Sequence, residues 1–333
     1  MSFLFLRIRV RLFAAAFVAS IAALIAPHPA QAQEAFPNKP ITIVVGFAPG
    51  GGTDIIIRLF ARAMEAHLGQ RIVVENRAGA GATIAAAHVA RAPADGYTLL
   101  AGSVSVNAVA PNLYKGLTYD SQTAFAPVSL LVTAPAVLVV SPKLNISSMK
   151  DLIAMYQREP GKHNFATGGG GTHAHLMSEW LMMTIGAKAV HVPFKGAAPA
   201  LQAVLGGEPT MIVDNIQAVL PHIAAGKLKP LAVFSAQRAS TLPDVPTMVE
   251  LGYKDFITDS WTAIYAPAGT PPAVIAKLNA AAAAAAHDPQ TIEMLTKINA
   301  APVGSPPAVL DQLTNFEYKR WGALIKQLNL SAN

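Results

Sequence analysis

The sequence contains no cysteine, and only 13% of its 333 residues are charged. The absence of cysteine excludes disulfide frameworks, thiolate metal sites, thiol redox chemistry and cysteine nucleophiles. Few charges combined with 52% apolar residues exclude a chain that is disordered throughout. The length corresponds to about two domains of ordinary size. We therefore expect a folded protein of two domains without cysteine chemistry.

The first 32 residues have the three-part layout of a secretory signal peptide. Three arginines lie within residues 7–11, the run 12–25 is apolar, and residues 30–32 read Ala-Gln-Ala, a small-x-small cleavage pattern. The apolar run is shorter than the ~20 residues that span a bilayer, although an uncleaved membrane anchor is the alternative. We expect residues 1–32 to be removed, a mature chain that begins at Gln33, and a periplasmic location.

The formal net charge of +6 gives little reason to expect a nucleic-acid partner. Three of the 25 basic residues belong to the signal peptide, so the mature chain has 22 basic and 19 acidic side chains. No run of basic residues with interleaved aromatic residues is present, and no later stretch resembles a membrane-spanning helix. We therefore expect a near-neutral exported protein that does not bind nucleic acid.

Short apolar strands alternate with helices, and glycine-containing turns connect them. Strands are expected at 41–45, 71–75, 97–101, 136–140, 164–166, 189–192, 211–213 and 228–234. Helices are expected at 53–67, 82–91, 148–158, 198–205 and 221–225, and after the glycine loop through residues 176–184, with three more starting at Thr270-Pro271, Asp288-Pro289 and Ser305-Pro306. Two such sets, each with a glycine-rich turn after an early strand, predict an α/β fold of two similar lobes that face each other across a cleft.

The turn at residues 46–53 lies between a strand and a helix, where anions are often bound. It matches the phosphate-binding pattern G-x-x-x-x-G-K-[ST] at both glycines and at Thr53, but Gly52 occupies the lysine position. Backbone N–H groups and the helix N-terminus can still hold an anion. A carboxylate suits such a weakly charged turn better than a polyphosphate, which Asp54 would also repel. The alternative is a turn that only caps the helix.

Four consecutive glycines at 168–171, between Thr167 and Thr172, are the stronger signal. They cost conformational entropy on folding, so a simple connector rarely needs four of them. The alternative is a flexible connector. Neither glycine turn has the G-x-G-x-x-G spacing of a dinucleotide site, and we expect no cofactor.

The pattern His173-x-His175 raises metal binding and base catalysis as further possibilities. A zinc site needs three or four ligands, the other histidines are scattered, and H-E-x-x-H is absent. No G-x-S-x-G elbow or spaced nucleophile–base pair is present either. We therefore expect neither a metal site nor an enzyme, with an exported hydrolase that uses His173 or His175 as its base as the competing class.

Further polar residues follow apolar strands or open helices. Asp214 directly follows the expected strand 211–213. It either contacts the ligand, orients the glycine loop or caps the following helix. Ser103 and Thr83 are candidates for the same positional reason, whereas Lys195 reads more simply as a solvated turn residue.

These motifs together resemble the Bug family, the periplasmic solute-binding proteins of tripartite tricarboxylate transporters. The segments that carry the resemblance are 36–41 (FPNKPI), 47–54 (FAPGGGTD), 74–81 (VENRAGAG), 94–99 (ADGYTL), the glycine loop through 176, 192–196 (VPFKG), 242–247 (LPDVPT) and 266–271 (APAGTP). They cover nearly the whole mature chain in order. The sequence departs from the family at Ala78, where proline is common, and at Ala82-Thr83, where Gly-Asn is common.

The resemblance implies a fold, a set of ligand contacts and partners. The fold is a type II-like Venus flytrap with domain 1 at 33–136 plus 258–333 and domain 2 at 137–257. The family holds ligand carboxylates mainly through backbone groups and waters of two β–α loops. With the polar candidates at strand ends and helix starts, the expected ligand-binding residues are Phe47, Ala48, Gly50, Gly51, Gly52, Thr53, Asp54, Thr83, Ser103, Thr167, Gly168, Gly169, Gly170, Gly171, Thr172, His173 and Asp214.

We therefore expect a monomeric binding protein for a small organic carboxylate. Opposed anion sites favour a dicarboxylate, aromatic such as terephthalate or aliphatic, and the scarcity of cations disfavours a citrate-like triple charge. The resemblance implies delivery to a large and a small integral membrane subunit, and a ligand sensor that docks on a membrane receptor is the alternative.

Overall fold

The computed structural model describes residues 36–332, so the predicted signal peptide and cleavage point lie outside the described residues. The chain divides into two units, Met1–Asn38 and Lys39–Asn333, and the second contains both β-sheets of the described residues. Within residues 36–332, no helix combines the length and the apolarity needed to cross a membrane.

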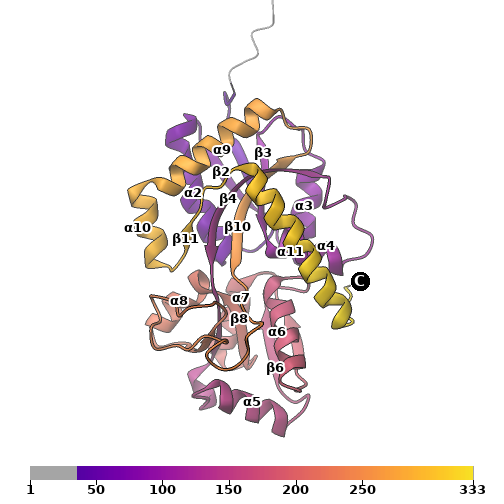
Figure 1. The fold of residues 1–333 in the computed structure, drawn as a ribbon, viewed down its shortest axis with the longest axis vertical. Coiled ribbons are helices and arrows are strands. Elements are labelled where there is room, and N and C mark those ends of the chain that lie inside the picture. The colour runs from indigo at the N-terminus through magenta and orange to yellow at the C-terminus, as the bar shows by residue number, and fades with distance from the viewer. Residues whose placement is uncertain (1–35, 333) are drawn as a thin grey trace, which may run out of the picture. The chain divides into compact units, whose positions relative to one another are not determined.

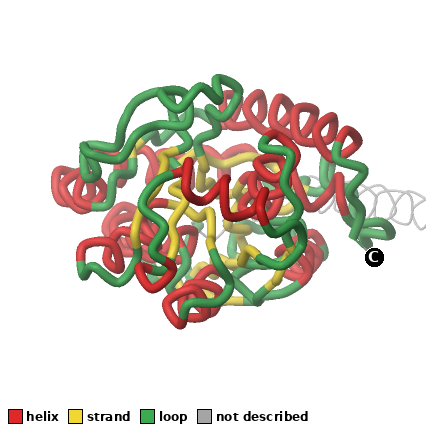
Figure 2. The backbone as a smooth tube through the Cα atoms, turned by 90° about the horizontal axis from the view of Figure 1, so that it is seen from below, coloured by secondary structure: helices red, strands yellow, loops and turns green. Residues whose placement is uncertain are grey.

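The unit from Lys39 contains two mixed β-sheets, each the centre of a lobe with helices outside the strands (Figures 1 and 2). The six-stranded sheet of lobe 1 has the order β11-β4-β10-β3-β1-β2, and the five-stranded sheet of lobe 2 has the order β7-β6-β8-β5-β9. The strands of lobe 1 are β1 (Ile41–Val45), β2 (Ile72–Asn76), β3 (Thr98–Ser103), β4 (Phe125–Ala134), β10 (Ser260–Pro267) and β11 (Ala301–Pro302). The strands of lobe 2 are β5 (Ala136–Val140), β6 (Asn164–Thr167), β7 (Val190–Pro193), β8 (Met211–Asn215) and β9 (Lys229–Val233).

Helices account for most of the remaining chain. Those of lobe 1 are α2 (Gly52–Leu68), α3 (Thr83–Ala90), α4 (Ala110–Leu113), α9 (Pro272–His287), α10 (Pro289–Lys297) and α11 (Pro307–Gln327), with a π-helical turn η2 (Val104–Val109). Those of lobe 2 are α5 (Met149–Arg158), α6 (His173–Thr184), α7 (Ala197–Gly206) and α8 (Ile216–Ala224). The expected α/β alternation is confirmed in both lobes.

Parallel pairing in lobe 1 follows from strands that are apolar on both faces. β1 lies between β2 and β3, parallel to each, and four of its five side chains are buried. A strand buried on both faces needs a continuous apolar run, which is what residues 41–45 provide. The carboxyl ends of β1 and β3 therefore lie at one edge of the sheet, where ligands bind in such folds.

Two long strands, β4 and β10, were not predicted from the sequence. They pair antiparallel with each other, and β10 also pairs antiparallel with β3 at the centre of the sheet. All eight residues of β10 are buried, but Ser260 and Thr262 interrupt the continuous apolar run that marks such a strand. Pro127 within β4 also argues against a strand, and it lies beside one of the register shifts between β4 and β10.

The chain crosses between the sheets at two places. It passes from β4 to β5 through the single residue Pro135 and returns just before β10 at Ser260. The domain boundaries expected at 136/137 and 257/258 stay predictions.

Two predicted helix starts are one residue too early. α9 begins at Pro272 and α11 at Pro307, because Pro271 and Pro306 each precede a second proline and are therefore held outside the helical region. The start at Asp288 is confirmed, since its carboxylate accepts a hydrogen bond from the N–H of Thr291 at 2.8 Å.

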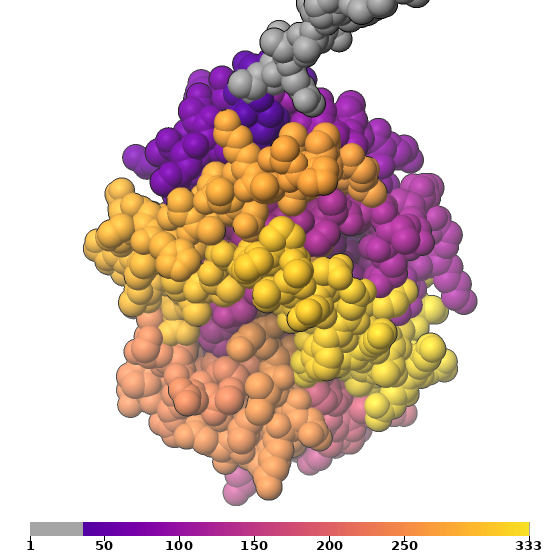
Figure 3. All heavy atoms as spheres, turned by 45° about the horizontal axis from the view of Figure 1, so that its top comes forward, coloured from indigo at the N-terminus to yellow at the C-terminus, as the bar shows by residue number. Residues whose placement is uncertain are grey.

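The C-terminal helix α11 contacts both lobes. In Figure 3 it runs as a yellow band from the orange helices toward the atoms of lobe 2. Trp321 meets Trp180 of α6 edge to face, with 6.5 Å between ring centroids, and Arg320 donates to the carbonyl of Ile257 at 3.0 Å. The end of the chain thus links the lobes beside their crossing point.

Candidate functional site

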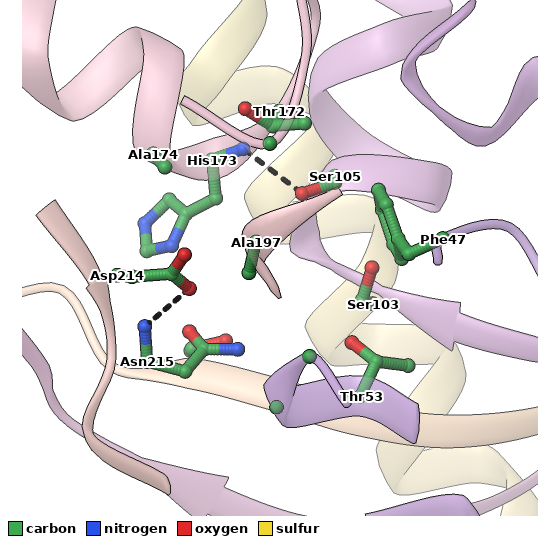
Figure 4. Close-up of a pocket in the computed structure, with 14 residues that line it drawn as sticks. Phe47, Thr53, Ser103, Ser105, Thr172, His173, Ala174, Ala197, Asp214 and Asn215 are labelled. Carbon is green, nitrogen blue, oxygen red and sulfur yellow. Dashed lines mark hydrogen bonds between the residues drawn. The ribbon is translucent and has the colours of Figure 1, made fainter. Parts of the chain in front are cut away.

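A cavity of about 50 Å³ lies between the two lobes (Figure 4). Its lining residues are Phe47, Gly51, Gly52, Thr53, Ser103, Ser105, Gly168, Thr172, His173, Ala174, Ala197, Asp214, Asn215 and Ser260. Both lobes contribute, and the helices α2 and α6 both begin at its wall.

On the lobe 1 side, the N-terminus of α2 has free donors. Gly51 is the N-cap residue and provides no side-chain cap. An uncapped helix start leaves backbone N–H groups that can hydrogen-bond an anion. Within the described chain, the hydroxyl groups of Thr53 and Ser260 also make no hydrogen bond to the protein, and both residues line the cavity.

Asp54 is directed into its own loop. Its carboxylate accepts hydrogen bonds from the N–H of Gly50 at 2.9 Å, the amide of Asn76 at 2.8 Å and Arg58 Nε at 3.0 Å. Burial alone would raise the pKa of Asp54, but the three hydrogen bonds and the charge of Arg58 together lower it. Asp54 is thus an ion-paired group that fixes the Gly50 turn, and it does not line the cavity.

Two serines at and just after the end of β3 line the cavity. Ser103 is the N-cap of η2, where its hydroxyl accepts from the N–H of Val106 at 3.4 Å. The hydroxyl of Ser105 accepts from the backbone N–H of His173, across the lobes, at 2.9 Å (Figure 4). A hydroxyl group that accepts one hydrogen bond can still donate its proton, so Ser105 retains a donor for a ligand.

The glycine loop of lobe 2 is held by hydrogen bonds. The Thr167 hydroxyl accepts from the N–H of Gly169 at 3.1 Å, and the Thr172 hydroxyl donates to the carbonyl of Gly169 at 2.8 Å. Gly169 has φ +134° and Gly171 has φ +75°, conformations that favour glycine. These contacts favour a shaped loop over a flexible connector.

His173 lies at the cavity but carries no positive charge there. Burial lowers its pKa to about 3. Its Nε2 is 2.7 Å from the hydroxyl of Thr258, and its ring meets Trp321 edge to face at 5.0 Å. A side chain held in this way is a poor general base near neutral pH, so the geometry gives no support to a hydrolase.

His175 lies outside the cavity, next to a second histidine. His175, Glu179 and His191 bring one potential metal-ligand atom each to within 4.8 Å of one another. The rings of His175 and His191 are stacked, with centroids 4.0 Å apart and planes 15° apart. The lone pairs of stacked rings lie in nearly parallel planes and do not converge on one ion. His191 also contacts the Thr167 hydroxyl at 2.7 Å, so the pair supports the glycine loop.

Asp214 lies at the end of β8 on the cavity wall. Its Oδ1 accepts from the N–H of Asn215 at 2.7 Å, and burial raises its pKa to about 7. It does not cap the next helix, because Asn215 is the N-cap of α8 and makes no side-chain cap. None of the lining residues is lysine or arginine, and the turn residue Lys195 is not among them.

Nine of the residues predicted from the sequence border this cavity. They are Phe47, Gly51, Gly52, Thr53, Ser103, Gly168, Thr172, His173 and Asp214. The remaining candidates do not line it: Ala48, Gly50, Asp54, Thr83, Thr167, Gly169, Gly170 and Gly171. Whether any of these residues contacts a ligand stays a prediction.

Ala82 and Thr83, where the sequence departs from the family, are not among the residues that line the cavity. The Thr83 hydroxyl donates to the carbonyl of Ala80 at 2.8 Å and does not line the cavity. Ala82 has φ 76°, a conformation that favours the glycine common at this position in the family.

Five lining residues were not predicted from the sequence: Ser105, Ala174, Ala197, Asn215 and Ser260. Asn215 directly follows Asp214 and Ser105 lies two residues after Ser103, so position near the end of a strand could have identified them. Ser260 had no such signal, because β10 itself was not predicted.

The lobes are in contact around the cavity. Tyr114 of lobe 1 donates its hydroxyl proton to the carbonyl of Gly170 at 2.9 Å. A Cβ placed on Gly52 would lie 2.9 Å from the Cβ of Asn215. The two lobes therefore meet beside the cavity.

Comparison with known proteins identifies the family. The sequence model of TctC, described as "Tripartite tricarboxylate transporter family receptor", matches residues 56–330. The chain belongs to the TctC family. This confirms the resemblance carried by the sequence motifs, and the two-lobed periplasmic binding protein fold is confirmed by the structural neighbours.

Three relatives illustrate the TctC likeness. Protein BugT of Bordetella pertussis is 39% identical over 298 residues, which cover 88% of this chain and 90% of BugT. An R. palustris protein solved with adipate is 34% identical with a TM-score of 0.86, covering 89% of this chain and 99% of that one. MatC from Rhodopseudomonas palustris, solved with bound malate, is 34% identical with a TM-score of 0.84. The match covers 87% of this chain and 100% of MatC. TctC proteins are solute-binding receptors rather than enzymes.

Proposed function

We propose that this protein captures a short organic carboxylate, most favourably a dicarboxylate, in the cavity between its lobes. The observation that carries the proposal is that two helices, α2 and α6, begin at one cavity, one from each lobe, and that its lining contains no lysine or arginine. Helix N-termini and hydroxyl groups bind a carboxylate through directed hydrogen bonds without a fixed cation.

The size of the cavity favours the aliphatic over the aromatic candidates. A space of about 50 Å³ holds roughly four water molecules. A short aliphatic acid fits such a space, whereas an aromatic diacid such as terephthalate needs the lobes to separate. The TctC relatives solved with malate and adipate support an aliphatic ligand.

Ligand capture works by lobe closure. In the open form, each helix N-terminus is exposed at its own lobe. A ligand that touches both lobes binds the closed form better and shifts the population toward it. The contacts between Tyr114 and Gly170, and between Ser105 and His173, support such a closed form.

We further propose that the mature protein begins at Gln33, resides in the periplasm and delivers its ligand to a large and a small membrane subunit of a tripartite transporter. The family match supports this assignment. N-terminal sequencing of exported protein tests the first part, and co-purification with the membrane subunits tests the last.

A thermal-shift screen tests the central proposal. A ligand present at a hundredfold excess over its Kd stabilises the folded protein by about 2.7 kcal/mol, provided that it binds only the folded state. We expect short mono- and dicarboxylates to raise the melting temperature and citrate to act weakly. A protein stabilised by inorganic phosphate or a divalent metal, but by no carboxylate, would contradict the proposal.

A further inference from the structure

Asp214 places an acidic side chain in a cavity proposed for an anion. Only 8% of its surface is exposed, and it lies at the end of β8 on the lobe 2 wall. One carboxylate oxygen accepts from the N–H of Asn215, whereas the other has no protein partner within the described chain (Figure 4). The carboxylate therefore offers an unused hydrogen-bond acceptor to the cavity.

No cation of the cavity wall compensates this carboxylate. The lining residues include neither lysine nor arginine, and His173 is neutral with its Nε2 at the Thr258 hydroxyl. Burial raises the pKa of Asp214 to about 7, because the hydrogen bond from the Asn215 N–H offsets only part of the cost of burying the charge. A buried carboxylate oxygen without a donor is costly, and a ligand donor placed at the second oxygen removes part of that cost.

We propose that Asp214 determines specificity by accepting a hydrogen bond from a hydroxyl or amino group of the ligand. The proposal rests on the function proposed for this cavity and narrows its substrate class to hydroxy- or amino-substituted carboxylates. The carboxylate of such a ligand binds at the helix N-termini, and its hydroxyl or ammonium group faces Asp214. An unsubstituted acid leaves Asp214 without a partner, and a second carboxylate placed there is repelled.

A structural role alone gives a different expectation. If Asp214 only shaped the start of α8, any acceptor for the Asn215 N–H would serve equally. Asp214→Asn keeps that acceptor as an amide oxygen and replaces the cavity-facing oxygen by a donor. The substitution therefore separates local structure from ligand selection.

The test uses two matched triplets of probes: succinate, L-malate and L-aspartate, and propionate, L-lactate and L-alanine. Affinities are measured by isothermal titration calorimetry at about pH 8, where a carboxyl group with a pKa near 7 is mostly ionised. We expect the wild-type protein to bind the substituted members of at least one triplet about tenfold or more tightly than the unsubstituted one. In Asp214→Asn this preference should fall to about twofold or less.

Asp244→Asn is the matched control, because it removes the same charge at an exposed position of lobe 2 outside the cavity. It should keep the wild-type preference. Wild-type protein that binds the unsubstituted acid as tightly as its substituted partners in both triplets overturns the proposal, even if Asp214→Asn does not fold. A preference that survives in folded Asp214→Asn also overturns it. If the protein binds only unsubstituted acids, the proposed carboxylate-binding function stands and the role of Asp214 is refuted. If it binds no carboxylate, both proposals are refuted.

Discussion

Replacing Gly52 by alanine should weaken ligand binding while leaving the folded protein intact. Gly52 is the first residue of α2 in lobe 1, and a Cβ there would lie 2.8 Å from Nδ2 and 2.9 Å from Cβ of Asn215 in lobe 2. Rotation can move the amide of Asn215, but its Cβ is fixed by the backbone. The added methyl group therefore forces the two lobes apart in the closed form.

The expected change in Kd can be estimated from the contact between Gly52 and Asn215. Ordinary carbon contacts begin near 3.4 Å, so the helix starts must separate by about 0.5 Å. An added methyl group in a packed site costs about 1–3 kcal/mol, and the closed form alone bears this cost. The Kd should rise by roughly 5- to 150-fold. Alanine favours a helix by up to about 1 kcal/mol over glycine, so stability without ligand should stay equal or increase.

Calorimetric titration with the best carboxylate from the thermal-shift screen, together with urea unfolding, measures both effects. Asn215→Gly removes the opposing Cβ, so in that background Gly52→Ala should change the Kd by about twofold or less. Gly206→Ala is the control for a helical glycine with open space around it, and it should leave the Kd unchanged. A Kd for Gly52→Ala within about twofold of wild type would refute the reasoning, because the liganded lobes would then not meet at this contact.

Three further changes have defined outcomes. Tyr114→Phe removes the interlobe hydrogen bond to Gly170 and should raise the Kd about two- to tenfold by calorimetry, and an unchanged Kd would exclude this bond from closure. Ala82→Gly relieves a left-handed alanine and should increase the free energy of unfolding by up to about 1 kcal/mol in urea titrations, whereas a clear loss would contradict the strain. His173 has its pKa lowered to about 3, so its contribution to stability is present above about pH 6.5 and is lost as the pH falls toward 3. His173→Asn should therefore lose less unfolding free energy than the wild type over that pH range. An equal loss in both proteins would show that His173 does not contribute to the pH dependence of stability.

Two elements, β1 and the turn to α2, had a clear local signal in the sequence. β1 is apolar throughout, so the sequence could identify it as a buried parallel strand, and the turn to α2 followed from its glycines. β10 had no such signal, because the polar residues Ser260 and Thr262 interrupt its apolar run although all eight of its residues are buried. Its partner β4 was not predicted either, because Pro127 within the run argues against a strand.

The site depends on contacts that no local pattern contains. Gly52 and Asn215 are far apart in sequence and meet only because the lobes close. The same holds for Ser105 and His173. Sequence reasoning could place Asp54 at a helix start, but its ion pair with Arg58 and its bond to the Gly50 turn required the folded structure.

A crystal structure of the mature protein with the carboxylate that stabilises it most tests the central claim most directly. The account predicts density for the ligand in the cavity lined by Thr53, Ser105 and Thr172, with carboxylate oxygens within hydrogen-bond distance of backbone N–H groups at the start of α2 or α6. A carboxylate bound outside this cavity, or held chiefly by lysine or arginine side chains, would contradict it.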